Sequence, residues 1–173
     1  EMCETAVEQV AGRKPVICHT AAMNFGQAMR LTRHAAAAGA TAVSAIPPLF
    51  FRYSQTELED YYLRLSEACE LPFIMYNHTS ANGGLSAEAV AEIYRKSPNI
   101  TGVKWTVNNY CAMMRLKEIT NGELNIINGP DEMLLQGLAA GADAGIGTTY
   151  NVMLPEYKEI YRLFANGDIA AAG

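Results

Sequence analysis

The segment Ile100-Thr101-Gly102-Val103-Lys104-Trp105-Thr106 places a lysine inside a short apolar run. Turn-forming residues bound the run, with Ser97-Pro98-Asn99 before it and Val107-Asn108-Asn109 after it, so we predict a buried β-strand. Apolar surroundings disfavour the charged form of a lysine, and a neutral amine is a nucleophile towards carbonyl groups. Lys104 is therefore a candidate nucleophile. The alternative is a structural lysine whose amine reaches solvent from the end of the strand.

Similar apolar runs of strand length lie on both sides of this segment, and helical stretches separate them. The six predicted strands are Pro15–His19, Ala42–Ile46, Phe73–Tyr76, Gly102–Thr106, Asn125–Asn128 and Asp143–Gly147. The predicted helices are Asn24–Ala38, Ser54–Glu70, Ser86–Lys96, Asn109–Thr120, Asp131–Ala140 and Pro155–Asn166. Strict alternation of helices with near-continuous apolar strands indicates a parallel sheet covered by helices.

Residues near the expected helix ends support these boundaries. Asn24 with Gln27, and Ser54 with Glu57, have the spacing of a capping box. Proline suits a first turn and glycine suits a C-terminal stop. The residues that fit these two positions are Pro130, Pro155, Gly39, Gly122, Gly141 and Gly167.

Two α/β architectures fit this alternation, a doubly wound open sheet and a (βα)8 barrel. No Gly-x-Gly-x-x-Gly loop follows the first strand, which weakens a dinucleotide-binding open sheet. A barrel gathers the C-terminal ends of its strands into one site. Polar residues crowd these ends at His19, Tyr76, Asn77, Lys104, Thr106, Asn128, Thr148, Thr149 and Tyr150. A typical barrel needs about 250 residues, so we expect an α/β, incomplete (βα)8 TIM barrel with about six βα units.

Composition and charge exclude several other classes of protein. Half of the residues are hydrophobic and the net charge is −5, which indicates a compact soluble protein without a basic surface for nucleic acid. No apolar stretch reaches the roughly 18 residues of a membrane span. The start, residues 1–4, lacks the blocks of a signal peptide, so we expect a cytoplasmic protein. Scattered Cys3, Cys18, Cys69 and Cys111 favour buried or half-buried thiols over a disulfide framework or a zinc site.

Four motifs together carry a resemblance to a known family. They are Tyr76-Asn77, Gly102-Val103-Lys104-Trp105-Thr106, Asn128-Gly129-Pro130-Asp131-Glu132 and Gly145-Ile146-Gly147-Thr148-Thr149-Tyr150-Asn151. The chain resembles the class I aldolases of the dihydrodipicolinate synthase and N-acetylneuraminate lyase superfamily, and the last two motifs are similar to the lyase branch. The resemblance implies that residues 1–173 are a partial barrel domain, with strands three to eight but without the first two strands and the C-terminal helices.

The resemblance also implies roles for the residues that could act on a substrate. Lys104 matches the lysine that forms a Schiff base with pyruvate, and an iminium is an electron sink for carbon–carbon cleavage. Tyr76 matches the tyrosine that moves a proton, and Thr106 matches a substrate-binding threonine. Without the lysine, these two would be read as a core aromatic residue at the barrel mouth and an ordinary β-branched strand residue.

Further residues match the sugar-binding positions of the lyases. Asp131 and Glu132 match an acidic pair that binds hydroxyl groups through charge-assisted hydrogen bonds. The alternative is two acids favoured in the first turn of a helix. Gly129 and Gly147 match glycines that let the backbone approach the ligand. Thr148 stands where the lyases commonly have serine, so the hydroxyl group is kept.

Three features depart from the family pattern. The Gly-Ser-Thr-Gly-Glu segment that binds the pyruvate carboxylate is absent and is expected upstream of residue 1. Phe50 lies where many members have a tyrosine that crosses a subunit interface to complete a proton relay, although Tyr53 could substitute. Ala81 replaces the carboxylate-binding arginine of the synthases, which argues against that activity. His19 and His78 receive no role, although His78 is close enough to Tyr76 to line the pocket.

These matches imply a lyase that splits N-acetylneuraminate reversibly into pyruvate and N-acetylmannosamine. Another pyruvate-dependent aldolase or dehydratase acting on a different 2-keto acid is the alternative enzyme, and a ligand-binding or regulatory barrel without turnover is the non-enzymatic alternative. The implied partners are small 2-keto sugar acids and pyruvate, in a homotetramer that binds neither nucleic acid nor membrane. No metal or organic cofactor is needed, because the lysine supplies the electron sink. We expect the chain by itself to be inactive.

Overall fold

The computed structural model describes residues 1–79 and 83–173 of the chain, in which helices and strands alternate. The strands are β1 (Ile17–His19), β2 (Ala42–Ala45), β3 (Phe73–His78), β4 (Ile100–Thr106), β5 (Asn125–Asn128) and β6 (Ala144–Gly145). The α-helices are α1 (Met2–Val10), α2 (Phe25–Ala37), α3 (Gln55–Ser66), α4 (Ala87–Lys96), α5 (Tyr110–Ile119), α6 (Leu134–Ala139), α7 (Leu154–Ala165) and α8 (Ile169–Ala172). The short 3-10 helices η1 (Asp131–Met133) and η2 (Thr149–Asn151) follow β5 and β6.

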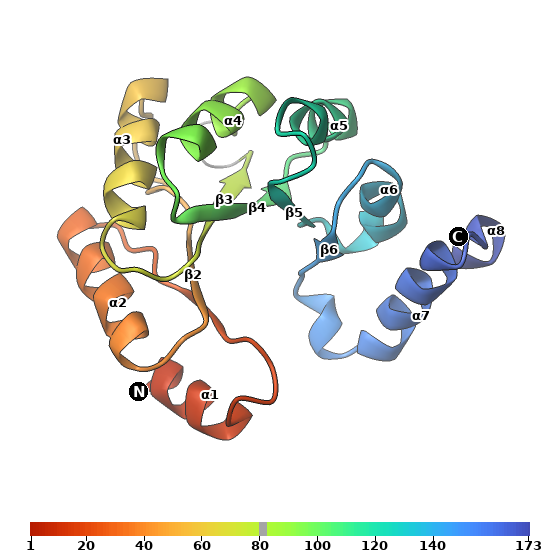
Figure 1. Cartoon of the computed structure of the whole chain (residues 1–173), viewed down its shortest axis with the longest axis horizontal. Coiled ribbons are helices and arrows are strands. Elements are labelled where there is room, and N and C mark those ends of the chain that lie inside the picture. Colours follow the sequence, from red (N-terminus) through yellow and green to blue (C-terminus); the bar gives the residue numbers. More distant parts are fainter. Residues whose placement is uncertain (80–82) are drawn as a thin grey trace.

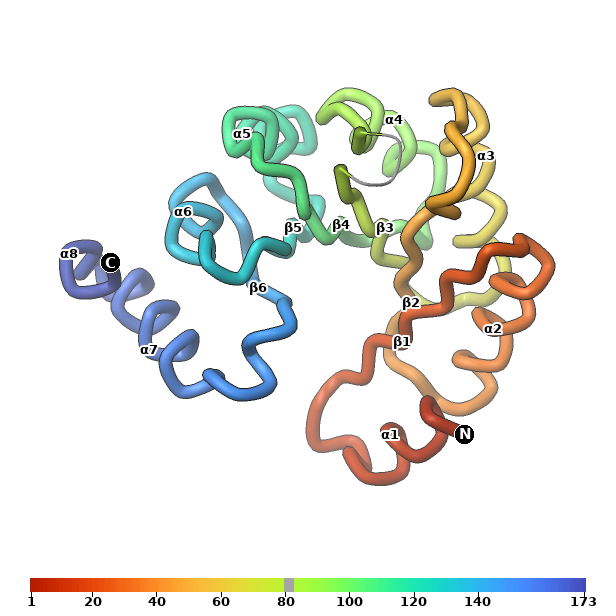
Figure 2. The backbone as a smooth tube through the Cα atoms, turned by 180° about the vertical axis from the view of Figure 1, so that it is seen from behind, coloured from red at the N-terminus to blue at the C-terminus, as the bar shows by residue number. Residues whose placement is uncertain are grey.

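The strands form one parallel sheet in the order in which they occur along the chain. The sheet curls into a half-barrel, with helices α2 to α6 along its outer side (Figure 1). Seen from behind, the curve stays open, with a gap between the edge strands β1 and β6 (Figure 2). The prediction of an incomplete (βα)8 barrel is therefore confirmed.

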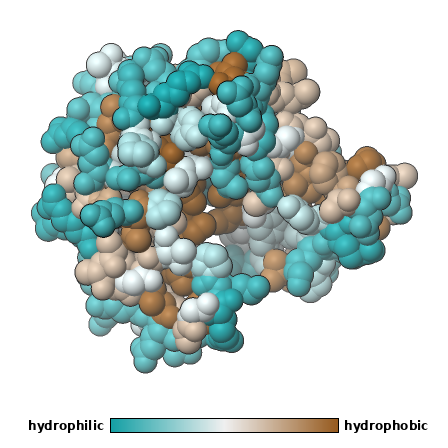
Figure 3. All heavy atoms as spheres, in the orientation of Figure 1, coloured by the Kyte–Doolittle hydropathy of each residue, from teal (hydrophilic) through white to brown (hydrophobic). Residues whose placement is uncertain are grey.

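Side-chain alternation along each strand divides the apolar residues into two layers. The larger layer lies between the sheet and the helices, and its fully buried members include Val43, Phe73, Val103 and Trp105. A smaller cluster of Ala42, Ile74 and Ile127, joined by Ala144, forms the other layer. Hydrophobic atoms surround a hollow near the centre of the molecule (Figure 3). Among the described residues, no helix is long and apolar enough to cross a membrane.

Most of the expected signals at the helix ends act as predicted, but Pro130 precedes η1 at its N-cap position and does not lie in its first turn. Ser54 and Glu57 form a full capping box, in which the Ser54 N–H donates to Glu57 Oε2 at 2.7 Å. Asn24 caps α2 by accepting from the Gln27 N–H, without the reciprocal bond. Pro155 lies in the first turn of α7. The glycines expected at helix ends all have positive φ, a conformation that costs glycine little; they are Gly39, Gly122, Gly141 and Gly167.

Several boundaries differ from the expectation for identifiable reasons. Strand β1 begins only at Ile17, because Pro15 has no N–H and the Val16 N–H donates to the Thr41 hydroxyl. Strand β6 keeps only two residues of the predicted five, because it pairs on one side only. The helix expected from Asp131 starts as η1 and becomes α6 at Leu134. Cys111 was expected to be buried or half-buried, but it is exposed, because it lies on the outer side of α5.

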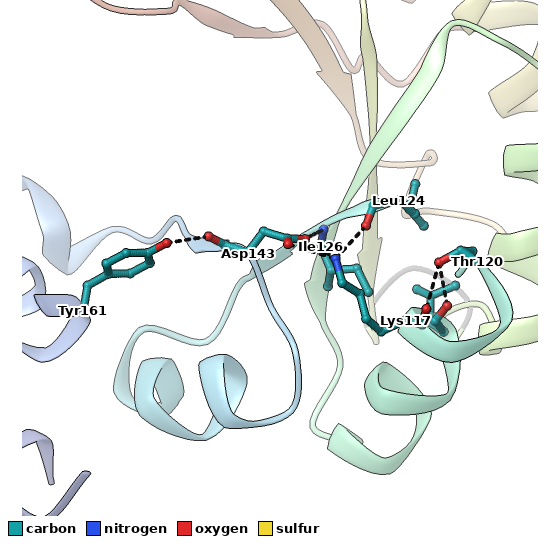
Figure 4. A network of polar contacts seen from close by, with 7 residues as sticks. Lys117, Thr120, Leu124, Ile126, Asp143 and Tyr161 are labelled. Atoms are coloured by element: carbon teal, nitrogen blue, oxygen red, sulfur yellow. Dashed lines mark hydrogen bonds and ion pairs between the residues drawn. The ribbon is translucent and has the colours of Figure 1, made fainter. Parts of the chain in front are cut away.

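A polar network fastens the last strand to the rest of the sheet (Figure 4). The Lys117 amine lies 2.8 Å from both carboxylate oxygens of Asp143 and also donates to the Leu124 carbonyl. The Asp143 carboxylate accepts from the Ile126 N–H at 2.8 Å. The backbone carbonyl of Asp143 accepts from the Tyr161 hydroxyl at 3.0 Å. One residue therefore links α5, β5, β6 and α7.

Replacing Asp143 with alanine should weaken this attachment. The Asp143→Ala variant removes the acceptor of the Ile126 N–H and leaves the half-buried Lys117 without its counter-ion. We expect a loss of about 1–3 kcal/mol of unfolding free energy, measured by urea denaturation. Asp60→Ala, which breaks an exposed pair with Arg64, is the control and should cost less than about 1 kcal/mol. Equal losses in the two variants would contradict the role of Asp143.

Candidate active site

Lys104 and Tyr76 meet on the inner side of the half-barrel. They are register partners on β4 and β3, so their side chains leave the sheet side by side. The Lys104 Nζ lies 4.1 Å from the centroid of the Tyr76 ring. Both residues line a cavity of about 170 Å³, together with His19, Ser44, Ile127 and Ile146. The arrangement places an amine and a phenol at one small, mostly apolar cavity.

Two histidines flank the tyrosine. The rings of His19 and His78 lie edge-on to Tyr76, with centroids 5.9 Å and 5.8 Å away. Burial lowers the pKa of both imidazoles, and the nearby charge of Lys104 lowers it further. Both rings are therefore neutral around pH 7, and their nitrogens can donate or accept a hydrogen bond there. His78 lies close to Tyr76, as expected, but it is not among the residues that line the cavity of Lys104, whereas His19 is.

Thr106 has a buried hydroxyl that faces the chain after β5. Its Oγ1 has no hydrogen-bond partner among the described residues. A Cβ built on Gly129 would overlap this oxygen and come within 3.0 Å of the Thr106 Cα. Glycine at 129 therefore makes room for Thr106, and the Gly129 N–H is bonded to the Trp105 carbonyl at 2.9 Å. A buried hydroxyl without a partner marks a place where a ligand or a water molecule can form a hydrogen bond.

Asp131 is held in place by the segment that follows β6. Its Oδ2 accepts from both the backbone N–H and the hydroxyl of Thr149, each at 2.6 Å. A Cβ on Gly147 would overlap the Asp131 carboxyl group, so only glycine lets these two segments approach each other. The half-buried carboxylate therefore has one oxygen with two donors and the other packed against Gly147.

Glu132 and Thr148 are exposed at the same end of the sheet. Two tyrosines that the sequence analysis did not assign to the site lie near the acidic pair. Burial raises the pKa of Tyr110, as does the charge of Glu132. Burial raises the pKa of Tyr150 to about 12, with the Asp131 carboxylate as the next cause. Tyr150 had a sequence signal, because it belongs to the motif at residues 145–151, whereas Tyr110 had only its position at the start of α5.

Two polar residues at strand ends point away from this cavity. The Asn77 side chain accepts from the Leu85 N–H at 2.7 Å and donates to the Leu85 carbonyl at 3.0 Å. The Asn128 side chain donates to the Pro130 carbonyl at 2.7 Å and packs against Gly137 of α6. Each follows an inward residue by one position, so the pleat turns it to the outer face. Both asparagines fix loops and do not line the cavity.

Two departures from the family pattern lie elsewhere. Phe50 is 77% exposed in the loop after β2, where its ring is in edge contact with Phe51 at 5.0 Å. Ala81, which stands where the synthases carry a carboxylate-binding arginine, lies outside the described residues.

The sequence matches the model of the Dihydrodipicolinate synthetase family over residues 1–173. It is 36% identical over 143 residues to an N-acetylneuraminate lyase of Rhizobium meliloti (strain 1021), covering 83% of this chain and 47% of that protein. It is 31% identical over 173 residues to a 4-hydroxy-tetrahydrodipicolinate synthase of Nitratidesulfovibrio vulgaris (strain DSM 19637 / Miyazaki F), covering 99% of this chain and 59% of that protein.

Among solved structures, the fold matches CdNal from Clostridium difficile in complex with mannosamine. The TM-score is 0.94 at 26% identity, covering 99% of this chain and 59% of that chain. The present chain thus spans about half the length of the curated relatives that it matches.

The close approach of Gly147 to Asp131 can be tested by compensation. Gly147→Ala should destabilise the protein by about 1–3 kcal/mol, because the new methyl group overlaps the carboxyl group. The overlapping atoms all belong to the Asp131 side chain, so Gly147→Ala should cost much less in an Asp131→Ala background. Thermal unfolding of the two single variants and the double variant measures this coupling. Additive losses would contradict the contact.

Proposed function

The chain belongs to the dihydrodipicolinate synthetase family, and we propose that it forms the catalytic part of a lyase that cleaves a 2-keto sugar acid, N-acetylneuraminate, into pyruvate and N-acetylmannosamine. The family consists of class I aldolases that use a lysine–pyruvate Schiff base without a metal cofactor. The observation that carries the proposal is the Lys104 amine over the Tyr76 ring at a small inner cavity. We also propose that residues 1–173 are part of a longer barrel.

In this proposal, the Lys104 amine attacks the C2 carbonyl of the keto acid. Loss of water then gives a protonated imine, an iminium, between Nζ and C2. The iminium is cationic, and the face of the Tyr76 ring lies where it would stabilise a positive charge. The C3–C4 bond breaks, and its electron pair moves through C3 and C2 to the iminium nitrogen and gives an enamine.

The cleavage also requires proton transfers, for which Tyr76 is the nearest candidate. The C4 hydroxyl must lose its proton as the aldehyde forms, and the enamine must gain a proton at C3. The Tyr76 phenol lies beside Lys104 on the neighbouring strand and reaches the same cavity. Water then hydrolyses the pyruvyl iminium, which releases pyruvate and restores the Lys104 amine.

The sugar half would bind farther along the same end of the sheet. We assign the contacts with the sugar to the side chains of Thr106, Asp131 and Glu132. Gly129, Gly147 and Thr148 would let the backbone come close to the sugar. Carboxylate oxygens accept strong hydrogen bonds from hydroxyl groups, as a polyhydroxylated chain requires. The unpartnered Thr106 hydroxyl and the exposed Glu132 carboxylate support this assignment.

A second candidate is a pyruvate-dependent aldolase or dehydratase acting on another 2-keto acid. The match to a 4-hydroxy-tetrahydrodipicolinate synthase at 31% identity favours this reading. The catalytic lysine would be the same in both enzymes, whereas the aldehyde partner would differ. A panel of aldehydes offered with pyruvate, including N-acetylmannosamine and aspartate semialdehyde, separates the two candidates. A barrel that binds but never turns over would condense none of them.

We further propose that the enzyme is a homotetramer, as the family resemblance implies, and that it is cytoplasmic. Phe50 and Phe51 support self-association, because they are 77% and 66% exposed and lie side by side. Burying two such rings between subunits would remove a large apolar area from water.

The nucleophile can be identified directly. We expect the full-length polypeptide that carries this chain, incubated with pyruvate and sodium borohydride, to gain one reduced pyruvyl adduct on Lys104. Intact-mass measurement and peptide mapping locate the adduct. Lys104→Met should gain none, whereas Lys117→Met, which removes a lysine of the Asp143 network, should still react. An adduct on another lysine, or no adduct in the unaltered protein, would refute the proposed mechanism.

The two halves of the substrate should depend on different residues. We expect Asp131→Ala and Glu132→Ala to lower kcat/KM for N-acetylneuraminate about tenfold to a hundredfold, because each loses a hydrogen bond to a charged group. Trapping of pyruvate on Lys104 should stay nearly unchanged. Glu156→Ala, an exposed acid on α7, serves as the control. Unimpaired cleavage in both site variants would exclude the sugar-binding assignment.

A further inference from the structure

A chain of hydrogen bonds runs from helix α7 to Asp131. The Tyr157 hydroxyl lies 2.7 Å from the Thr149 hydroxyl. The Thr149 hydroxyl lies 2.6 Å from Asp131 Oδ2, which also accepts from the Thr149 N–H at 2.6 Å. Tyr157 therefore reaches the acidic residue through a single intermediate side chain.

The direction of these bonds follows from the groups involved. An ionised carboxylate can only accept, so the Thr149 hydroxyl must give its one proton to Asp131. The same hydroxyl then has only lone pairs left for its other neighbour. Tyr157 must therefore donate to Thr149, which polarises the Thr149 hydroxyl and strengthens its bond to the carboxylate.

Packing against Tyr150 holds Tyr157, the first residue of this series of hydrogen bonds, in place. The Tyr150 ring lies edge-on to Tyr157, with centroids 3.9 Å apart and ring planes at 74°. Because burial and the Asp131 charge raise the pKa of Tyr150 to about 12, Tyr150 stays protonated and adds no second negative charge beside the carboxylate. The tyrosine pair thus presents Tyr157 to Thr149 in one orientation.

We propose that Tyr157 is a positioning residue that fixes, through Thr149, which oxygen of Asp131 is offered to the aldose. Oδ2 is occupied by the two donors of Thr149, so a sugar hydroxyl must approach the other oxygen, beside Gly147. Helix α7 thereby sets aldose selection while lying outside the cavity of Lys104. This inference rests on the proposed function, because it requires Asp131 to bind the aldose.

Single-atom substitutions in the full-length polypeptide test the inference. Tyr157→Phe should raise KM for N-acetylmannosamine in the synthetic direction about threefold to tenfold, while KM for pyruvate and borohydride trapping on Lys104 stay unchanged. Thr149→Ser should behave like the unaltered protein, and Thr149→Val should show at least the defect of Tyr157→Phe. Tyr161→Phe, on the same helix, is the control for a general loosening of α7, because it removes the bond to the Asp143 carbonyl and leaves the Thr149 hydroxyl untouched.

The effect must also pass through Asp131. In an Asp131→Ala background, Tyr157→Phe should have no further effect on the aldose KM. The inference is overturned if Tyr157→Phe leaves the aldose KM unchanged, or if it impairs aldose and pyruvate equally, as a general loss of structure would. If the unaltered protein forms no pyruvyl adduct, the proposed function fails instead, and the positioning role fails with it.

Discussion

The two-residue alternation of side chains along parallel strands is the constraint on which this structure depends. On β4, Val103 and Trp105 face the helices and are fully buried, whereas Lys104 between them faces the inner cavity. A shift of one residue would bury the amine among the helices and expose the tryptophan. The apolar residues that hold the helices onto the sheet thus also fix the direction of the Lys104 amine.

The same alternation divides the polar residues into two groups with different tasks. Tyr76 and Lys104 face inward as register partners, and this pairing brings the phenol and the amine together. Asn77 and Asn128 face outward and tie the loops after β3 and β5 to the outer layer. The polar groups that fix loops and those that line the cavity therefore occupy neighbouring positions in the sequence but opposite faces of the sheet.

Close backbone approach is the second organising feature of the site. Gly129 and Gly147 leave space for the side chains of Thr106 and Asp131, so consecutive strand ends touch each other through side chain and backbone. The network around Asp143 fastens β6 to β5 and α7, and thereby keeps the segment containing Gly147 and Thr149 within reach of Asp131. Asp131 is consequently held in place by Thr149, which follows β6, and by helix α7, which contacts Thr149.

The sequence by itself determined the succession of strands and helices, the parallel half-barrel and the inward lysine on β4, because these follow from local hydrophobic periodicity and from residues at helix ends. It also determined the capping of α3 by Ser54, a contact between residues three apart. Only the tertiary structure decided that Gly129 and Gly147 accommodate side chains and that Tyr157 reaches Asp131 through Thr149. Those outcomes depend on which strand ends lie side by side, and that proximity between distant residues arises only when the sheet curls.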